Sequence, residues 1–377
     1  MNRLTLLAVS FISCTLFAQN RTPIKERVSV QSDSAKVSQI VDGEWVCVGL
    51  KKDYAIQHDH DLKFEGKPSY RFELRKQDNT LSGYAEGETK GRAEMSYCYA
   101  VSSDFDGAAP DVYSDASRMK TVYHHGKGSC PQGSHMKYRF SIYVPEDLSP
   151  DVSTIFAQWH GMPSRTLVSN PEGKVMLLTD KEFLELESRM IFKKNIAYDK
   201  IESKDSKGKT VYKRSKEPNG WHVEQGGYPP MAFGFSKGYF YIKANSDAEW
   251  LSDKTVRCNS SPEKHETMQP VKQKHKVSTI AYKMPFEDFP KGKWVTFDIE
   301  VKWSEYAPGE KKEVSKGKLD VYMSYSGKKQ HIVDNQTVSI GRNDKDGYYF
   351  KFGIYRVGNS DVPVVYNLAG YSEEVIK

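Results

Sequence analysis

The most restrictive feature of this sequence is a series of short segments in which apolar and polar residues alternate one by one. In Ser69–Arg75, for example, Tyr70, Phe72 and Leu74 occupy every second position. Because successive side chains of a β-strand point to opposite faces, such a segment buries one face and exposes the other. Similar runs are Arg92–Ala100, Lys137–Pro145, Ser153–His160, Met231–Ala244, Trp294–Trp303, Lys318–Tyr325 and Tyr348–Val357. Turn residues separate them, which predicts an all-β sandwich, with the jelly-roll as its common large form.

One stretch, from about residue 165 to residue 220, breaks this rhythm. It is rich in Lys and contains the clearest helix signal in the chain, because Thr179 and Glu182 have the spacing of a capping box. Phe183 and Leu186 follow at helical spacing. Apolar residues are otherwise sparse here, so we expect an excursion from the sandwich rather than a second independent domain.

The N-terminus has the form of a secretory signal peptide. A basic residue precedes the apolar stretch Leu4–Phe17, and the small residue Ala18 follows it, which predicts cleavage after Ala18. We therefore expect residues 1–18 to be removed and residues 19–377 to form one domain, exported to the periplasm or secreted. No later apolar run is long enough to cross a membrane, so stable membrane insertion is not expected.

Charge and cysteine usage exclude some classes without naming a function. The net charge of +6 permits a polyanionic ligand but does not identify one, and we expect no nucleic-acid partner. Aromatic residues make up 12% of the chain, too many for a disordered protein. No two cysteines have C-x-x-C spacing, so a zinc site is not expected.

Three of the predicted strands carry polar side chains of catalytic type on a single face. Alternation puts these side chains together within each strand. They are Arg92 and Glu94 in the first strand, Gln158 and His160 in the second, and Tyr349, Lys351 and Tyr355 in the third. Gly353, between Lys351 and Tyr355, would give a ligand room to approach the sheet.

This set of residue types suits the β-elimination of a 4-linked uronate. That reaction needs a cationic or hydrogen-bonding clamp on the carboxylate, a base for the C5 proton and an acid for the leaving oxygen. His can be the base, Tyr the acid, and Arg or Gln the clamp. The residues alone leave open a solvated polar face, a noncatalytic carbohydrate-binding jelly-roll, and a glycoside hydrolase. The hydrolase would need two carboxylates across the scissile bond, and no E-x-D-x-x-E cluster is present.

The same segments carry a resemblance to known lyases. Arg92–Glu94, Gln158–His160 and Tyr349–Tyr355 resemble the R-x-E, Q-x-H and Y-F-K-x-G-x-Y segments of jelly-roll alginate lyases. A lyase for alginate or another uronate polymer is therefore one alternative. Longer stretches are similar to the heparin lyase I (heparinase I) family of polysaccharide lyases, namely Gly87–Arg92, Thr121–Gly128, Ser153–Gly161, Val223–Pro229 and Ile340–Gly358. This similarity runs from about Arg27 to Ser372.

The resemblance implies a β-jelly-roll with a thumb-like extension and a groove for heparin. It implies endolytic β-elimination of the 1,4 linkage between glucosamine and 2-O-sulfated iduronate, which leaves 4,5-unsaturated oligosaccharides. His160 would be the general base and Tyr355 the general acid, while Gln158, Arg92 and Lys351 would bind carboxylate or sulfate. We expect a monomer that acts on heparin, with heparan sulfate as a second candidate. We expect the cysteines to be buried thiols that act as small apolar residues; Cys130 is a candidate neighbour of the groove without a catalytic role.

Further residues are candidates for binding the sulfated substrate and for binding calcium. Arg binds oxyanions with two parallel hydrogen bonds, so further substrate contacts are sought among cations and amides near the matching segments. The candidates are Arg165, Gln225, Lys243 and Arg257. The family is also associated with calcium, which prefers oxygen ligands. The candidate ligands are Glu224, Asn343, Asp344 and the backbone carbonyl of Trp250.

Overall fold

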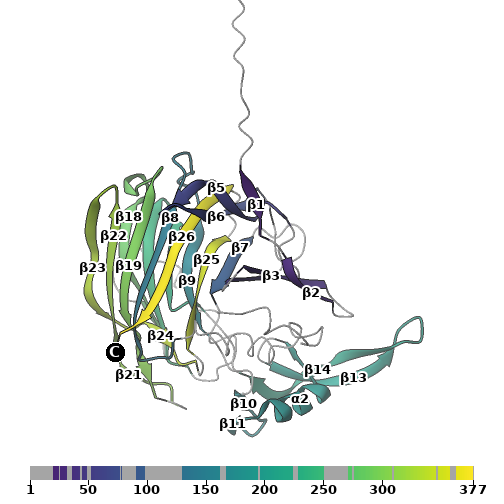
Figure 1. The fold of residues 1–377 in the computed structure, drawn as a ribbon. Coiled ribbons are helices and arrows are strands. Elements are labelled where there is room, and N and C mark those ends of the chain that lie inside the picture. The colour runs from purple at the N-terminus through teal and green to yellow at the C-terminus, as the bar shows by residue number, and fades with distance from the viewer. Residues whose placement is uncertain are drawn as a thin grey trace, which may run out of the picture.

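Two large sheets stack face to face in the computed structural model of the chain (Figure 1). The structure describes residues 20–24, 26–31, 36–42, 45–48, 52–76, 78, 91–97, 130–161, 167–193, 196–223, 228–249, 271–273, 276–307, 310–344, 347–356 and 362–376. Within these residues the architecture is almost entirely β, as the alternating segments predict. None of the described helices is long and apolar enough to cross a membrane.

The first sheet has eight strands in the described part of the chain. In spatial order they are β1 (Arg21–Pro23), β5 (Ile56–Phe64), β6 (Lys67–Leu74), β26 (Val364–Val375), β8 (His135–Tyr143), β19 (Trp294–Lys302), β22 (Gly317–Tyr325) and β23 (Lys328–Val338). All of its neighbouring strands pair antiparallel. One face of this sheet packs on the core, and the other faces solvent.

The second sheet has eleven described strands and contains every strand predicted to carry catalytic side chains. In spatial order they are β17 (Val271–Gln273), β18 (Lys276–Pro285), β16 (Tyr239–Asp247), β15 (Met231–Ser236), β9 (Thr154–Gly161), β25 (Tyr348–Arg356), β7 (Arg92–Tyr97), β4 (Trp45–Val48), β3 (Lys36–Asp42) and β2 (Glu26–Gln31). The short β24 (Gly341–Arg342) pairs with β16. Outside the two sheets lie a 3-10 turn, Phe286–Asp288, and the strand pair β20 (Glu305–Tyr306) and β21 (Glu313–Ser315).

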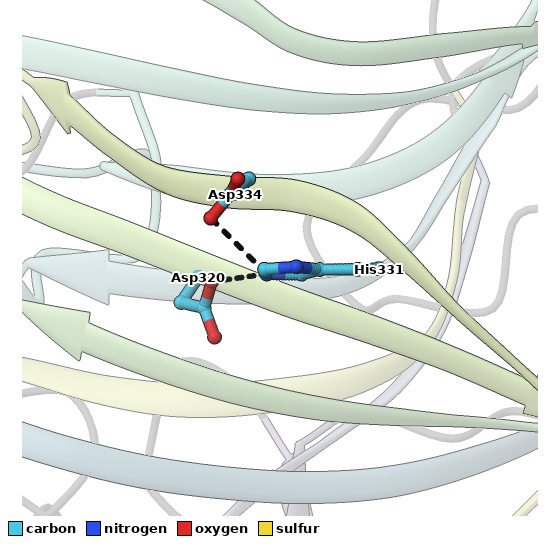
Figure 2. Close-up of side chains that lie close together, drawn as sticks. All are labelled: Asp320, His331 and Asp334. Carbon is cyan, nitrogen blue, oxygen red and sulfur yellow. Dashed lines mark hydrogen bonds and ion pairs between the residues drawn. The ribbon is translucent and has the colours of Figure 1, made fainter.

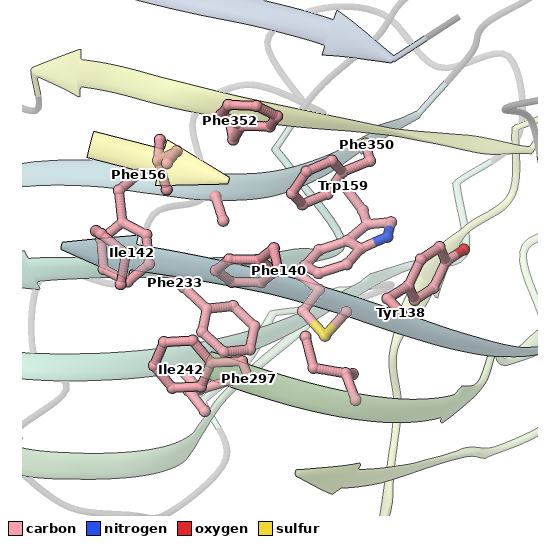
Figure 3. Close-up of a cluster of buried hydrophobic side chains, with 14 of the residues drawn as sticks. Tyr138, Phe140, Ile142, Phe156, Trp159, Phe233, Ile242, Phe297, Phe350 and Phe352 are labelled. Carbon is pink, nitrogen blue, oxygen red and sulfur yellow. The ribbon is translucent and has the colours of Figure 1, made fainter. Parts of the chain in front are cut away.

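Aromatic side chains fill the space between the two sheets (Figure 3). Phe140 of β8 and Phe297 of β19 meet Trp159 of β9 and Phe350 of β25, all of them fully buried. The rings of Trp159 and Phe350 lie 4.9 Å apart, in the range where aromatic pairs contribute about 0.5–1.5 kcal/mol beyond area burial. Because side chains alternate along a strand, burying Trp159 and Phe350 forces Gln158, His160 and Lys351 onto the opposite face.

The predicted excursion is a separate small sheet with one helix, here called the thumb (residues 167–223). Its strands, in spatial order, are β11 (Val175–Leu177), β10 (Leu167–Ser169), β14 (Thr210–Val223), β13 (Ile196–Lys204) and β12 (Met190–Lys193), and its helix is α2 (Asp180–Arg189). The capping box is confirmed, because Glu182 N–H donates to Thr179 Oγ1 and the Glu182 carboxylate accepts from Thr179 N–H. A small apolar cluster around Phe183 and Leu186 supports it. In Figure 1 the hairpin β13–β14 projects away from the eight-stranded sheet.

One prediction about this architecture was wrong. Met231–Ala244 is not one strand but a hairpin, in which β15 and β16 are joined by Lys237 and Gly238. Both turn residues have positive φ, 52° and 73°, which lets the chain reverse within two residues. Cys130 is a buried thiol, as expected of the cysteines, and Tyr138 Oη donates to its Sγ at 3.0 Å. Burial raises the pKa of this thiol to about 12.

Candidate active site

Three adjacent strands, β9, β25 and β7, carry the predicted catalytic residues on the outer face of the eleven-stranded sheet. Antiparallel pairing puts Lys351 directly opposite Gln158 on one side and opposite Ser96 on the other. Tyr355 is likewise opposite Arg92. Residues opposite one another across a strand pair share a face, so segments far apart in sequence supply one continuous surface.

Glu94 joins these residues through its carboxylate, although sequence reasoning assigned it no role. Its Oε1 accepts a hydrogen bond from Gln158 Nε2, and its Oε2 accepts one from Lys351 Nζ at 3.2 Å. Arg92 Nε lies 3.8 Å from the same Oε2. Only 6% of the Glu94 side chain is exposed, so these contacts are shielded from solvent. The R-x-E spacing was the available signal, since it puts Glu94 on the same face as Arg92.

His160 is half-buried and held in one tautomer. Its Nδ1 lies 3.0 Å from the carbonyl oxygen of Gly161, and because a carbonyl can only accept, Nδ1 carries the proton. Burial, reinforced by the charges of Lys351, Arg342 and Arg92, lowers the pKa of His160 to about 4. The ring is therefore neutral near pH 7, with an unprotonated Nε2 that can accept a proton.

The two tyrosines of β25 have different surroundings. Tyr355 lies under Arg92, whose guanidinium carbon is 4.2 Å from the ring centre. Tyr349 is the residue opposite His160 in the strand register, and their ring centres are 5.7 Å apart. The structure therefore brings Tyr355 together with Arg92, Glu94 and Lys351, whereas Tyr349 is the tyrosine beside the histidine.

Lys243 belongs to the same surface. It is opposite Ala232 of β15, which is itself opposite Gln158. Lys243, Gln158 and Lys351 consequently lie in one row across four strands. Burial lowers the pKa of Lys243 to about 8. The Lys243 side chain is half-buried and lies in the same row as Gln158 and Lys351.

A buried ion pair supports the His160 end of β9. Arg342 Nε donates to Asp344 Oδ2 at 2.8 Å, and both side chains are almost fully buried. A side chain at Gly161 would not fit, because its Cβ would lie 1.9 Å from Asp344 Oδ2. The Tyr348 hydroxyl also donates to the carbonyl of Arg342 at 2.7 Å. These contacts fix the backbone on which the Nδ1 hydrogen bond of His160 depends.

Gly353 has a different role from the one predicted. Its φ is +135°, and a Cβ there would lie 2.1 Å from the carbonyl oxygen of Ala93 on the neighbouring strand. The glycine is therefore required by the backbone conformation and by close packing between β25 and β7, not by space for a ligand.

The donor set around Asn343 is compatible with calcium. Asn343 Nδ2 donates to three backbone carbonyl oxygens, those of Ala248, Ala307 and Glu310, at 3.2, 3.4 and 2.8 Å. Backbone carbonyl and amide oxygens are of the type that Ca²⁺ prefers, although here the three carbonyl oxygens surround the amide nitrogen of Asn343. Asp344 is less well placed as a ligand, because its carboxylate already pairs with Arg342. Glu224 and Trp250, the other predicted ligands, lie outside the described residues, as do Arg165, Gln225, Arg257 and residues 1–18.

A second cluster of titratable side chains lies on the other sheet (Figure 2). His331 of β23 approaches Asp320 of β22, with Nε2 and Oδ1 2.5 Å apart, and Asp334 at 3.8 Å. The backbone N–H of Asn335, which has φ +41°, also donates to Asp320 Oδ1 at 3.0 Å. Two residues of β23 oppose one of β22 here, so these contacts stabilise a β-bulge. The cluster is not part of the β9–β25–β7 surface.

Comparison with known proteins agrees with this geometry. The family model described as polysaccharide lyase matches residues 33–368, and the chain belongs to this family. It is thus an enzyme of the polysaccharide lyase class. Over 366 residues the chain is 58% identical to heparin lyase I of Pedobacter heparinus. This alignment covers 96% of this chain and 95% of that protein.

Similarity to solved structures is weaker. An endo-β-1,4-glucuronan lyase from Trichoderma reesei aligns with 94% of each chain at 8% identity and a TM-score of 0.40. A PL-14 alginate lyase from Aplysia kurodai aligns with 86% of this chain and 88% of its own at 8% identity and a TM-score of 0.39. These TM-scores are too low to assign a class, and the class of this chain follows from the family match.

Proposed function

We propose that this protein is an endolytic heparin lyase that cleaves the 1,4 linkage between glucosamine and 2-O-sulfated iduronate by β-elimination. The observation that carries the proposal is a neutral His160, with a free Nε2, on the same face as the cations Lys351 and Arg92. The 58% identity to heparin lyase I selects heparin among uronate polymers.

The chemistry divides among the side chains as follows. Gln158, Lys351 and Arg92 bind the uronate carboxylate or a neighbouring sulfate, which stabilises the negative charge that develops when C5 is deprotonated. Nε2 of His160 takes the C5 proton, and the electron pair of that bond forms the C4–C5 double bond. The C4–O bond breaks, and Tyr355 gives its phenolic proton to the leaving oxygen. In iduronate the C5 proton and the C4 oxygen leave from opposite faces, which favours separate base and acid.

Cations distributed over the site face would bind the sulfated polymer. Lys243 supports this proposal by its place in the row with Gln158 and Lys351, and Arg165, Arg257 and Gln225 are further candidates. Contacts of this kind are ionic, so affinity should fall steeply with salt, by analogy with counterion release from nucleic acids. Binding that did not change with salt would contradict a role for these cations.

The proposal also includes a bound calcium ion, export of the protein and a monomeric state. Asn343 and the carbonyl groups around it would hold calcium together with Glu224, Asp344 and the carbonyl of Trp250, and the ion would stabilise the backbone that follows β24. Loss of calcium-dependent thermal stabilisation in a Glu224→Ala variant tests this role. We further propose removal of residues 1–18, a periplasmic or secreted location, a monomeric state, and heparan sulfate as a second substrate.

The deciding experiment is digestion of defined heparin, heparan sulfate and alginate oligosaccharides, followed by ultraviolet absorbance and mass analysis of the products. We expect conjugated, unsaturated ends from heparin. Saturated ends would identify a hydrolase, absence of cleavage would identify a binding protein, and cleavage of alginate alone would change the substrate.

A further inference from the structure

Glu94 is the only carboxylate among the described residues that contacts both Gln158 and Lys351. Each oxygen has its own partner, because Oε1 faces the Gln158 amide and Oε2 faces the Lys351 ammonium. The three side chains come from three different strands, β7, β9 and β25. Glu94 therefore connects the strands that supply the proposed carboxylate clamp.

The contact with Gln158 determines which way its amide points. A carboxylate can only accept hydrogen bonds, so Nε2 must face Glu94 and Oε1 must be directed away from that oxygen. One of the two N–H groups of Gln158 is then occupied, and one remains for a substrate. An uncharged residue at position 94 would not select this orientation of the amide.

The contact with Lys351 sets both its position and the local charge. The Lys351 side chain is only 12% exposed, and the bond to Glu94 leaves two of its three N–H donors for other partners. Arg92 and Lys351 supply two positive charges, and Glu94 removes one of them. Arg92, Lys351 and Glu94 together therefore carry one net positive charge beside the neutral His160.

We propose that Glu94 is a positioning residue of this active site, which orients Gln158 and Lys351 and limits the positive charge beside His160. The inference rests on the proposed lyase function. Glu94 itself does not touch the reacting atoms. It acts by holding the clamp in the geometry that the transition state requires, since small displacements of such groups are costly to the rate.

The test compares Glu94→Gln and Glu94→Asp with wild type on heparin, in kcat, KM and the pH profile of kcat/KM. For Glu94→Gln we expect a fall in kcat of about 10- to 100-fold with KM unchanged or lower, because the clamp is misplaced but more positive. Removal of a negative charge also disfavours the protonated His160 imidazole, so the acid limb of the profile should move to lower pH. Glu94→Asp keeps the charge, so its acid limb should stay at the wild-type position.

Ser96→Ala is the matched control, because Ser96 is buried on the same face of β7 and lies opposite Lys351. We expect it to behave like wild type. An unchanged kcat and acid limb in Glu94→Gln would overturn the inference, as would an equal loss at every pH accompanied by a lower melting temperature. Failure of the wild-type protein to produce unsaturated ends would instead contradict the proposed function, so the two failures are distinguishable.

Discussion

His160 and His331 lie on the outer faces of the two sheets and have opposite surroundings. His331 is exposed, stacks on Tyr322 at 4.1 Å and points its Nε2 at Asp320 (Figure 2). His160 is half-buried, donates to a backbone carbonyl and lies among cations. Burial and neighbouring cations favour the neutral imidazole at His160. The comparison shows that the neighbours, not the residue type, make a histidine suitable as a base.

The largest expected difference in kcat is between variants of the two histidines. We expect His160→Ala to lower kcat on heparin by about 10³- to 10⁴-fold, because it removes the general base. His331→Ala removes the surface contact with Asp320 on the other sheet and should keep near-normal kcat. Product absorbance measures both, and circular dichroism checks that both variants fold. Comparable activity of the two variants would refute the assignment of His160.

A second pair of variants separates the two tyrosines of β25. Tyr355→Phe should lower kcat by about 10²- to 10³-fold, since it removes the proposed acid but keeps the ring under Arg92. Tyr349→Phe, beside His160, should lose less than about tenfold. The opposite order of effects would transfer the acid role to Tyr349.

The pH dependence should reflect the surroundings of His160. The base acts in its neutral form, so kcat/KM should fall only as the pH drops towards about 4, the pKa to which burial and cations lower His160. Below that pH the rate should fall about tenfold per unit, as expected for one protonation. An acid limb near the ordinary histidine pKa of about 6.5 would show that the cations do not act on the ring. The measurement is kcat/KM across the acid range at constant ionic strength.

The smallest expected effect is on heparin affinity, compared between a lysine of the eleven-stranded sheet and one of the eight-stranded sheet. Lys243→Gln should weaken heparin binding by about three- to tenfold, the range of one well-placed ionic contact. Lys137→Gln, on the eight-stranded sheet, removes the same charge from an exposed position and should have little effect. Because the pKa of Lys243 is lowered to about 8, wild-type binding should weaken above that pH more than binding by Lys243→Gln. Equal losses in the two variants, measured by calorimetry, would indicate that only net charge matters.

Much of the fold could be predicted from local patterns. Alternation located most of the core strands and their polar faces, because the period of two is set by the strand backbone itself. The capping box located the start of helix α2, since Thr179 and Glu182 contact each other within one turn. Gln158 and His160 could likewise be assigned to one face without knowledge of the partner strands.

Predictions that depended on distant neighbours were less successful. Met231–Ala244 looked like one run, but its core positions change from odd numbers before Lys237 to even numbers after Gly238, where the chain reverses. Gly353 looked like space for a ligand, whereas the carbonyl of Ala93 occupies the position of its absent side chain.

Alternating segments and the matching motifs were enough to predict an all-β sandwich and a set of lyase-like residues, because both depend on residues close together in sequence. The tertiary structure decided how those residues act on one another. Strand pairing brings Glu94 to Gln158 and Lys351, while burial and nearby cations lower the pKa of His160. The contacts of Glu94 join residues 64 and 257 positions apart in the chain. Their strength depends on distance and solvent exclusion, which no local pattern encodes.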